Sequence, residues 1–248
     1  MYENVETGLE AAAARAASKP TVDGADAAQY RFDDERVDTG IAELAAAAPT
    51  NDAPDTTSEW INPGKGVSPQ APPAFIQPNF DRMPPELKPL KNWVLWAAVW
   101  NGSNWKKRPM QISGYWASAT NAKHWSSFND VQQAYERAVQ RGYMELRERG
   151  KPVQQVPVGG VGFVFDGSPD ENGLVLAGVD FDKVISEGRI APIAKKRIKR
   201  LGSYTELSVS GGGLHVILKA RPLKSGIAHD GVEMYTSGRF FTMTGAAL

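Results

Sequence analysis

The sequence predicts an α+β fold in which a largely antiparallel or mixed central sheet is flanked by helices. Short apolar runs bounded by Gly, Asn, Asp or Pro recur along the second half of the chain, as strands do. Two segments with apolar residues at helical spacing lie among them. Strands with interspersed helices are typical of an α+β or mixed α/β domain.

The elements follow one another in a regular order. Residues 92–100 (NWVLWAAVW) form an apolar run with three tryptophans, which we expect in the core, and the turn residues NGSN end it. Residues 126–150 predict a helix that begins near Ser126 or Ser127. Residues 158–165 and 174–182 predict two strands joined by a polar turn, and residues 189–202 predict a basic helix that ends at Gly202. Residues 203–210 and 213–222 predict two more strands around a glycine cluster, and 231–235 with 238–245 predict a final hairpin.

Charge divides the chain into two parts. Residues 1–81 carry 5 Lys and Arg against 14 Asp and Glu, whereas residues 82–248 carry 23 against 14. The first part is rich in alanine and acid, and eight prolines lie between Pro63 and Pro89. Proline at this density is typical of an extended linker. We therefore expect residues 1–85 to be a disordered acidic arm and linker, and residues 86–248 to be a folded domain whose basic balance suits nucleic acid.

Composition also excludes several classes of site. The chain has no cysteine, which excludes disulfides and thiolate-bound zinc or iron–sulfur clusters. No apolar segment is long enough to span a membrane, and the acidic N-terminus is unlike a secretory signal. We expect a cytoplasmic protein.

Two carboxylates end the apolar run LVLAGVDFD. Asp180 and Asp182 share one face of the predicted strand, with backbones roughly 7 Å apart. A divalent cation would remove the repulsion between them, and oxygen ligands without cysteine favour Mg²⁺ or Mn²⁺. The alternative is a strand that ends in solvent with two surface aspartates.

A glycine cluster follows in SVSGGGLHV. Gly211, Gly212 and Gly213 allow the backbone to approach a ligand, and their N–H groups can bind phosphate oxygens. His215 lies on the face opposite Leu214 and Val216 and could contact a phosphate. The alternative is a hairpin turn with a partly buried histidine.

A third carboxylate lies in GVEMYTSGRFF. Glu233 could be a further metal ligand, and the planar guanidinium of Arg239 suits a phosphate. The alternative is an exposed ion pair across a hairpin. Two carboxylates, a glycine loop with histidine, and a carboxylate with arginine together describe a metal–triphosphate site.

The order VDFD, SYTELSVSGGGLH and GVEMYTSGRFFTMTG resembles the bifunctional DNA primase–polymerase (PrimPol-like) domain of phage and plasmid replication proteins, in the archaeo-eukaryotic primase superfamily. The resemblance extends upstream through NWVLW, KKRPM, ASATNAKHWSSF and GVGFVF, and it covers residues 87–245. It implies a primase-like catalytic domain at residues 86–248 that performs template-directed nucleotidyl transfer with two Mg²⁺ or Mn²⁺ ions.

The resemblance also implies roles for individual residues. Its metal ligands and catalytic residues match Asp180, Asp182 and Glu233, with His215 on the phosphates of the incoming nucleotide. The nucleotide-binding residues that it implies are Ser210, Gly211, Gly212, Gly213, His215, Arg239 and Lys107, of which Arg239 and Lys107 lie in matched segments without a fixed role. Tyr204 and Glu206 belong to the matched SYTE stretch, where we expect them to support the sheet.

The implied partners are a single-stranded DNA template, a primer and dNTPs or NTPs. These replication proteins usually continue into a helical region and often a helicase, whereas this chain stops at Leu248, as a fragment or a stand-alone domain would. Val209 replaces the proline of the family's usual S-P-S-G loop. A basic run adds predicted contacts to the nucleic-acid backbone, or forms a solvated helix face, through Lys195, Lys196, Arg197, Lys199 and Arg200.

Two other functions use the same residues. A metal-dependent nuclease or phosphodiesterase also needs clustered carboxylates and a histidine. A non-catalytic nucleic-acid-binding module would need only the basic surface, tethered by the acidic arm. The glycine loop and Arg239 favour a triphosphate substrate and therefore the primase–polymerase interpretation.

Overall fold

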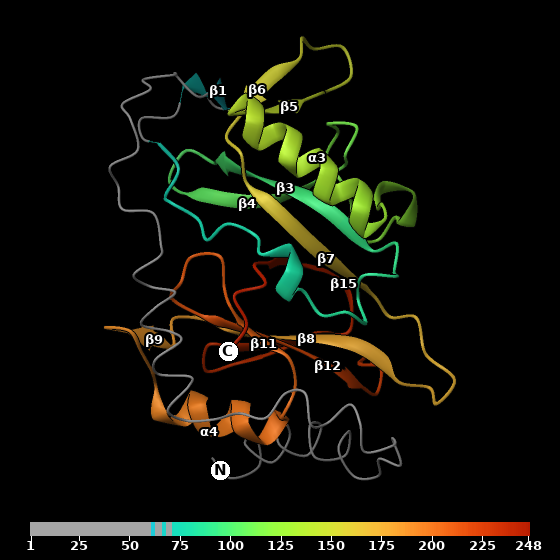
Figure 1. Cartoon of the computed structure of the whole chain (residues 1–248), viewed down its shortest axis with the longest axis vertical. Coiled ribbons are helices and arrows are strands. Elements are labelled where there is room, and N and C mark those ends of the chain that lie inside the picture. The colour runs from blue at the N-terminus through green and yellow to red at the C-terminus, as the bar shows by residue number, and fades with distance from the viewer. Residues whose placement is uncertain (1–60, 63–65, 68–70) are drawn as a thin grey trace.

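The computed structural model describes residues 61–62, 66–67 and 71–248 (Figure 1). Most of the predicted disordered arm, namely residues 1–60, 63–65 and 68–70, lies outside the described residues. Within the described part of the chain, no helix combines the length and the apolar character needed to cross a membrane.

Two antiparallel sheets form the body of the protein. The five-stranded sheet has the order β11 (Thr205–Leu207), β12 (Leu214–Ala220), β8 (Val175–Phe181), β14 (Val232–Tyr235) and β13 (Ile227–His229). The four-stranded sheet has the order β15 (Ser237–Met243), β7 (Gly160–Asp166), β3 (Trp93–Trp100) and β4 (Trp105–Met110). Every strand pairing among the described residues is antiparallel, which confirms the predicted strand arrangement. The single central sheet was a wrong expectation, because the strands divide into two sheets that pack on each other.

Shorter elements complete the fold. Three two-stranded pairs are β1 (Ile61–Asn62) with β2 (Gly66–Val67), β5 (Met144–Leu146) with β6 (Gln154–Val156), and β9 (Ile185–Ser186) with β10 (Arg189–Ile190). Two 3₁₀ turns are η1 (Phe80–Arg82) and η2 (Ala122–His124).

Helix α3 (Phe128–Arg141) is shorter than the sequence predicts. Ser127 caps its start by accepting a hydrogen bond from the Asp130 amide. Its buried side chains lie at helical spacing and are Phe128, Val131, Ala134, Tyr135 and Ala138. Gly142 ends it in the left-handed region, at φ 80°, where glycine is favoured. The chain then leaves as β5, so the prediction of helix up to residue 150 was wrong.

Helix α4 (Pro192–Leu201) confirms the predicted basic helix and its end at Gly202. Pro192 occupies the first turn, where its missing N–H is tolerated. The two helices lie at opposite ends of the molecule with both sheets between them (Figure 1). Helix α3 packs on β3 and β7, and Ala194 and Ile198 of α4 pack on the five-stranded sheet.

The predicted final hairpin does not form. β14 pairs with β8 and β13 in one sheet, whereas β15 pairs with β7 in the other. The connection at Thr236 therefore carries the chain from one sheet to the next, and the Thr236 hydroxyl accepts a hydrogen bond from the Leu223 amide there. Gly238, at φ 67°, supports the irregular start of β15. The sequence shows two neighbouring strands but not which partner each one takes.

The expected linker is ordered in its last part. Phe75 is buried with its ring 5.0 Å from that of Trp96, in an edge-to-face contact. The amides of Ile76 and Asn79 donate to the carbonyls of Val209 and Thr244. The expectation that disorder extends to residue 85 is therefore wrong for residues 75–85, because this segment pairs its backbone with the domain and buries a ring there.

Two of the three tryptophans of β3 confirm the predicted core. Trp93 and Trp96 are almost completely buried, and the Trp93 indole donates to the carbonyl of Leu87. Trp100 is half-buried and packs beside Trp105, at 5.8 Å between ring centroids. β3 is therefore held by side-chain packing on both of its faces.

Candidate active site

Four side chains that can carry charge lie in one row across the five-stranded sheet. The strand register places Glu206 of β11 opposite His215 of β12, His215 opposite Asp180 of β8, and Asp180 opposite Glu233 of β14. Directly opposed residues on antiparallel strands share a face. We call Glu206, His215, Asp180 and Glu233 the polar row. The structure thus brings together three of the predicted site residues, Asp180, His215 and Glu233, which come from different parts of the sequence.

The polar row faces the four-stranded sheet. Val179 and Phe181, the neighbours of Asp180, point the other way and pack in the cluster that includes α4. Gly178 lies on the same face as Asp180, against the rings of Phe165 and Phe241. The space between the two sheets therefore holds both an apolar core and the polar row.

Exposure changes steadily along the polar row. The Glu206 side chain is fully buried and that of His215 is 6% exposed, whereas Asp180 and Glu233 reach 34% and 39%. The row thus runs from the interior to solvent. Its exposed end carries two carboxylates that a ligand can reach.

His215 lies between two carboxylates. Its Nε2 is 3.8 Å from Oδ1 of Asp180, and its Nδ1 is 3.6 Å from Oε1 of Glu206. Both distances are ion-pair distances and too long for hydrogen bonds. The ring also packs on Phe241, at 4.9 Å between centroids. The imidazole is therefore held in place with one nitrogen toward the interior and the other toward the exposed end of the row.

The carboxyl group of Asp180 interacts electrostatically with the other charged residues of the site. Burial raises the pKa of its carboxyl above the ordinary value, and the neighbouring charges of Asp182 and Glu233 raise it further. The charges of His215 and Lys107 act in the opposite direction and lower it. A cation bound beside Asp180 would offset this repulsion, since it favours the ionised form.

Lys107, the predicted residue with no fixed role, lies on β4 opposite Ala98. It is exposed, and its charge acts on the Asp180 carboxyl even though the two residues belong to different sheets. β4 is a border strand of its sheet and contains Pro109, which such a position tolerates. The structure therefore places Lys107 within electrostatic reach of the polar row.

The glycine loop abuts the end of β8, where Asp180 is the last residue but one of the strand and Asp182 follows in a turn. A Cβ atom at Gly213 would lie 2.5 Å from the Phe181 carbonyl oxygen, so only glycine fits this approach. The Ser208 hydroxyl accepts from the Gly213 amide at 3.1 Å and lies 3.2 Å from the Ser210 hydroxyl. The Asp182 amide donates to the carbonyl of Gly231 at 2.8 Å. These contacts place Gly213 beside Asp182 and Ser210 beside Ser208. The amides of Gly211 and Gly213 donate within the loop, to the carbonyl and the hydroxyl of Ser208.

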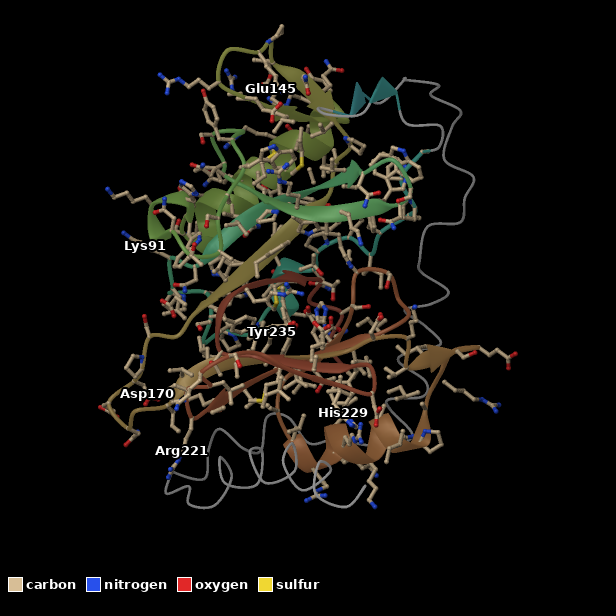
Figure 2. The ribbon with its side chains drawn as sticks, turned by 180° about the vertical axis from the view of Figure 1, so that it is seen from behind. Lys91, Glu145, Asp170, Arg221, His229 and Tyr235 are labelled. Carbon is tan, nitrogen blue, oxygen red and sulfur yellow. The ribbon has the colours of Figure 1, made fainter. Side chains whose placement is uncertain are left out.

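Glu233 has two partners, one from its own strand and one from the other sheet. The Tyr235 hydroxyl donates to its Oε2 at 2.8 Å, and this hydrogen bond is the main cause that raises the pKa of Tyr235. Nη2 of Arg239 lies 3.6 Å from the same oxygen, and the guanidinium stacks over the Tyr235 ring at 4.6 Å. Figure 2 labels Tyr235, in the region between the two sheets. Arg239 therefore reaches Glu233 from the other sheet.

The predicted nucleic-acid-binding residues lie elsewhere. Helix α4 covers the face of the five-stranded sheet opposite the polar row, because Val179 and Phe181 rather than Asp180 point toward it. The structure does not bring the basic residues of this helix to the polar row; they are Lys195, Lys196, Arg197, Lys199 and Arg200. Any nucleic acid bound there would lie on the other side of this sheet from the carboxylates.

The donor set of the site fits a hard divalent cation. Asp180, Asp182 and Glu233 offer carboxylate oxygens, which Mg²⁺ and Mn²⁺ prefer. Burial and the charges of Asp182 and Glu233 keep the pKa of Asp180 raised, although the charges of His215 and Lys107 lower it. Among the described residues, no three His, Asp or Glu side chains are already arranged as a metal-binding group. The chemistry of the residues therefore fits such an ion, and binding would require their side chains to converge.

Sequence reasoning assigned Glu206 only a supporting role. The structure places this buried carboxylate next to His215, where it accepts hydrogen bonds from the Tyr204 hydroxyl and from two backbone amides. Glu206 and His215 face each other across the β11–β12 hairpin, whose loop is residues 208–213. A hairpin of the two predicted strands centred between Ser210 and Gly211 would have placed them opposite each other.

Comparison with known proteins agrees with the geometry. No protein-family profile matches the chain. The chain is 30% identical over 171 residues to a protein of Nitratiruptor phage NrS-1 named DNA Primase-polymerase. The match covers 65% of this chain and 20% of the phage protein, so the chain spans about a fifth of its relative's length. Over that region, this chain is a distant homologue of the phage DNA primase-polymerase, which confirms the resemblance found in its motifs.

Proposed function

We propose that the chain is a template-directed nucleotidyltransferase, a DNA primase or DNA polymerase acting in phage- or plasmid-type replication. The polar row carries this proposal: His215, Asp180 and Glu233 lie side by side on three neighbouring strands, with the glycine loop against the end of the middle one. The relative's name supports the same reaction class. The domain that performs it corresponds to the predicted residues 86–248, extended at its start by the packed segment from Phe75.

Three carboxylates would hold two divalent cations, Mg²⁺ or Mn²⁺. They are Asp180, Asp182 and Glu233, which already act on one another electrostatically. Bound ions of this kind lower the pKa of an attacking 3′-hydroxyl and neutralise the leaving pyrophosphate. Glu233 would exchange its hydrogen bond with Tyr235 and its ion pair with Arg239 for such an ion.

The remaining residues bind and orient the triphosphate. His215 presents Nε2 beside Asp180, and the glycine loop approaches Asp182 through Gly213. Arg239 and Lys107 supply positive charge from the four-stranded sheet. Holding the triphosphate and the hydroxyl in line provides most of the rate enhancement in such transfers. These contacts together form the proposed nucleotide site.

The proposed partners are a single-stranded DNA template, a primer and dNTPs or NTPs. Helix α4 would bind the backbone of the nucleic acid away from the polar row, through the five basic residues of that helix. A further proposed partner is a helicase or an additional helical region. The proposed site of action is the host cytoplasm or nucleoid.

The test is incorporation of labelled nucleotides on single-stranded DNA, with and without an annealed primer, in Mg²⁺ or Mn²⁺. The wild type should yield template-dependent products, and an Asp180→Ala/Asp182→Ala double variant should yield none. Glu171→Ala, which removes an exposed carboxylate from the turn before β8, is the matched control and should retain full activity.

Two results would replace the proposal with another function. Shortened nucleic acid without pyrophosphate release would indicate a metal-dependent nuclease that uses the same carboxylates. Unchanged DNA binding in the double variant, together with no product from the folded wild type under any condition, would indicate a non-catalytic binding module.

A further inference from the structure

We propose that Glu206 is a positioning residue that keeps the ring proton of neutral His215 on Nδ1, so that Nε2, which faces Asp180 and the exposed end of the polar row, does not carry it. The significance of this arrangement for nucleotide binding rests on the function proposed above, whereas the arrangement itself can be measured without any reaction. Glu206 does not reach the exposed end of the row and acts only through His215.

The Glu206 carboxylate is a rigid, fully buried acceptor. Its Oε2 accepts from the Tyr204 hydroxyl at 2.7 Å and from the Gly245 amide at 2.7 Å. The Thr244 amide lies 3.1 Å from Oε1 and 3.2 Å from Oε2. A carboxylate is almost never fully buried without such partners. Three donors thus hold the carboxylate in one orientation, with Oε1 toward His215.

The facing atom of His215 has no other partner. Nδ1 is buried, makes no hydrogen bond, and lies 3.6 Å from Oε1 of Glu206. A shift of roughly 0.5 Å would close a hydrogen bond between them. Packing on Phe241 limits rotation of the ring. An unpartnered buried nitrogen that faces a fixed acceptor is satisfied when it carries a proton and donates it.

The contact between Nδ1 and Glu206 also determines whether Nε2 carries a proton. In the neutral ring, the single proton lies on Nδ1 and Nε2 is left facing Asp180. In the protonated ring, Nδ1 still donates to Glu206, and Nε2 carries the second proton. In both forms, Nε2 is the atom available at the exposed end of the row. Outer hydrogen bonds fix the tautomer of functional histidines in the same way.

A purely structural role for Glu206 makes different predictions. The carboxylate also ties Thr244 and Gly245 to β11, so its replacement should destabilise the fold in either case. Only the positioning role requires the proton of His215 to move. The ring proton is therefore the property to measure.

Glu206→Gln is the informative variant because it keeps the shape of the side chain. Its amide oxygen can take the place of Oε2 and accept from Tyr204 and Gly245. Its NH₂ group then takes the place of Oε1 and presents a donor to Nδ1 of His215. Two donors cannot face each other, so the ring proton should move to Nε2.

Side-chain ¹⁵N NMR of the full chain shows directly which ring nitrogen of His215 carries the proton. The chain has 3 histidines, so the ring nitrogens of each are assigned before the tautomer of His215 is determined. We expect His215 to be in the Nδ1–H form in the wild type and in the Nε2–H form in Glu206→Gln. The same tautomer in both proteins would overturn the proposal.

Nucleotide affinity provides the second measurement, by calorimetric titration with dATP and Mg²⁺. Glu206→Gln should raise the Kd for dATP about tenfold. Without the Glu206 carboxylate, the protonated His215 ring loses its partner, and its charge-assisted contact with a phosphate is lost. Thr244→Val is the matched control: it removes hydrogen bonds to Leu207 and Ala246 but leaves Glu206 and His215 in place. It should lower stability and leave the Kd unchanged.

Failure of the positioning role and failure of the proposed function give different results. An equal loss of affinity in Thr244→Val and Glu206→Gln would overturn the positioning role and indicate a structural one. If no protein binds dATP but the tautomer changes as expected, the arrangement of Glu206 and His215 stands and the proposed function fails.

Discussion

Gly178 of β8 lies directly against Phe241 of β15, and this contact joins the two sheets next to the polar row. A Cβ atom at position 178 would lie 2.6 Å from the Phe241 ring and 2.6 Å from that of Phe165. Asp180 follows two residues later on the same face. The closeness of the sheets at Gly178 therefore fixes how far Asp180 lies from residues of the opposite sheet.

Gly178→Ala should consequently destabilise the protein. The added methyl group must displace two buried rings, and overpacking of this kind costs about 1–3 kcal/mol. Thermal unfolding measures the change. Gly212→Ala is the matched control, because its nearest neighbour would be the Ser210 hydroxyl at 3.9 Å. Equal stability of the two variants would show that the sheets are not closely packed at Gly178.

Asp180→Asn should stabilise the fold at neutral pH. Burial and two neighbouring carboxylates raise the pKa of Asp180 in the folded state, so the ionised form opposes folding. A raised pKa contributes stability that is fully present below the unfolded pKa and is lost as the pH rises through the folded pKa. The variant should therefore unfold a few degrees above the wild type at pH 7.

The same reasoning gives a control for the Asp180→Asn comparison. The difference in melting temperature should disappear near pH 3, about one unit below the ordinary pKa of an aspartate, because the wild-type carboxyl is then neutral too. Metal-free buffer is required for both measurements. A melting temperature at pH 7 below that of the wild type would contradict the electrostatic account of the site.

Arg239 should matter through its geometry as well as its charge. Its guanidinium stacks over Tyr235 and reaches Glu233, so we expect both Arg239→Ala and Arg239→Lys to raise the KM for a dNTP about tenfold. Lysine lacks the planar fork and should rescue little of the loss. Steady-state primer extension measures this, with the exposed Arg221→Ala as control. Full rescue by lysine would reduce the role of Arg239 to that of a point charge.

Phe75 should contribute to stability although it lies in a proline-rich stretch. Its ring is buried against Trp96, and replacing a buried Phe by Ala typically costs about 3–5 kcal/mol. Denaturant unfolding of Phe75→Ala measures the cost, and the exposed neighbour Ala74→Ser is the control. A variant as stable as the wild type would show that residues 75–85 belong to the predicted linker and do not stabilise the domain.

Local patterns predicted helices α3 and α4, most strands of the two large sheets and three members of the polar row. Alternation along β8 and β14 placed Asp180 and Glu233 on their correct faces, and Ser127 and Gly202 marked helix ends through local hydrogen bonding. These features depend on neighbours within a few residues, which the sequence shows directly.

The features that sequence reasoning missed depend on distant partners. β14 and β15 are neighbours in sequence but join different sheets, because each finds a better partner in β8 and β7. The proximity of Lys107 to Asp180 depends on how the two sheets pack. Phe75 is buried because Trp96 and Val209 lie beside it, which proline content cannot reveal. Non-local pairing of this kind has no short-range signal.

The most direct test of the central claim is simultaneous detection of one-nucleotide primer extension and pyrophosphate release, by the wild type and by Asp180→Asn. The wild type should produce the two products in equal amounts in Mg²⁺ or Mn²⁺. Asp180→Asn should produce neither while melting at or above the wild-type temperature, so that loss of the fold cannot explain the result. Equal extension and pyrophosphate release by Asp180→Asn and the wild type would contradict the claim that nucleotidyl transfer takes place at the polar row.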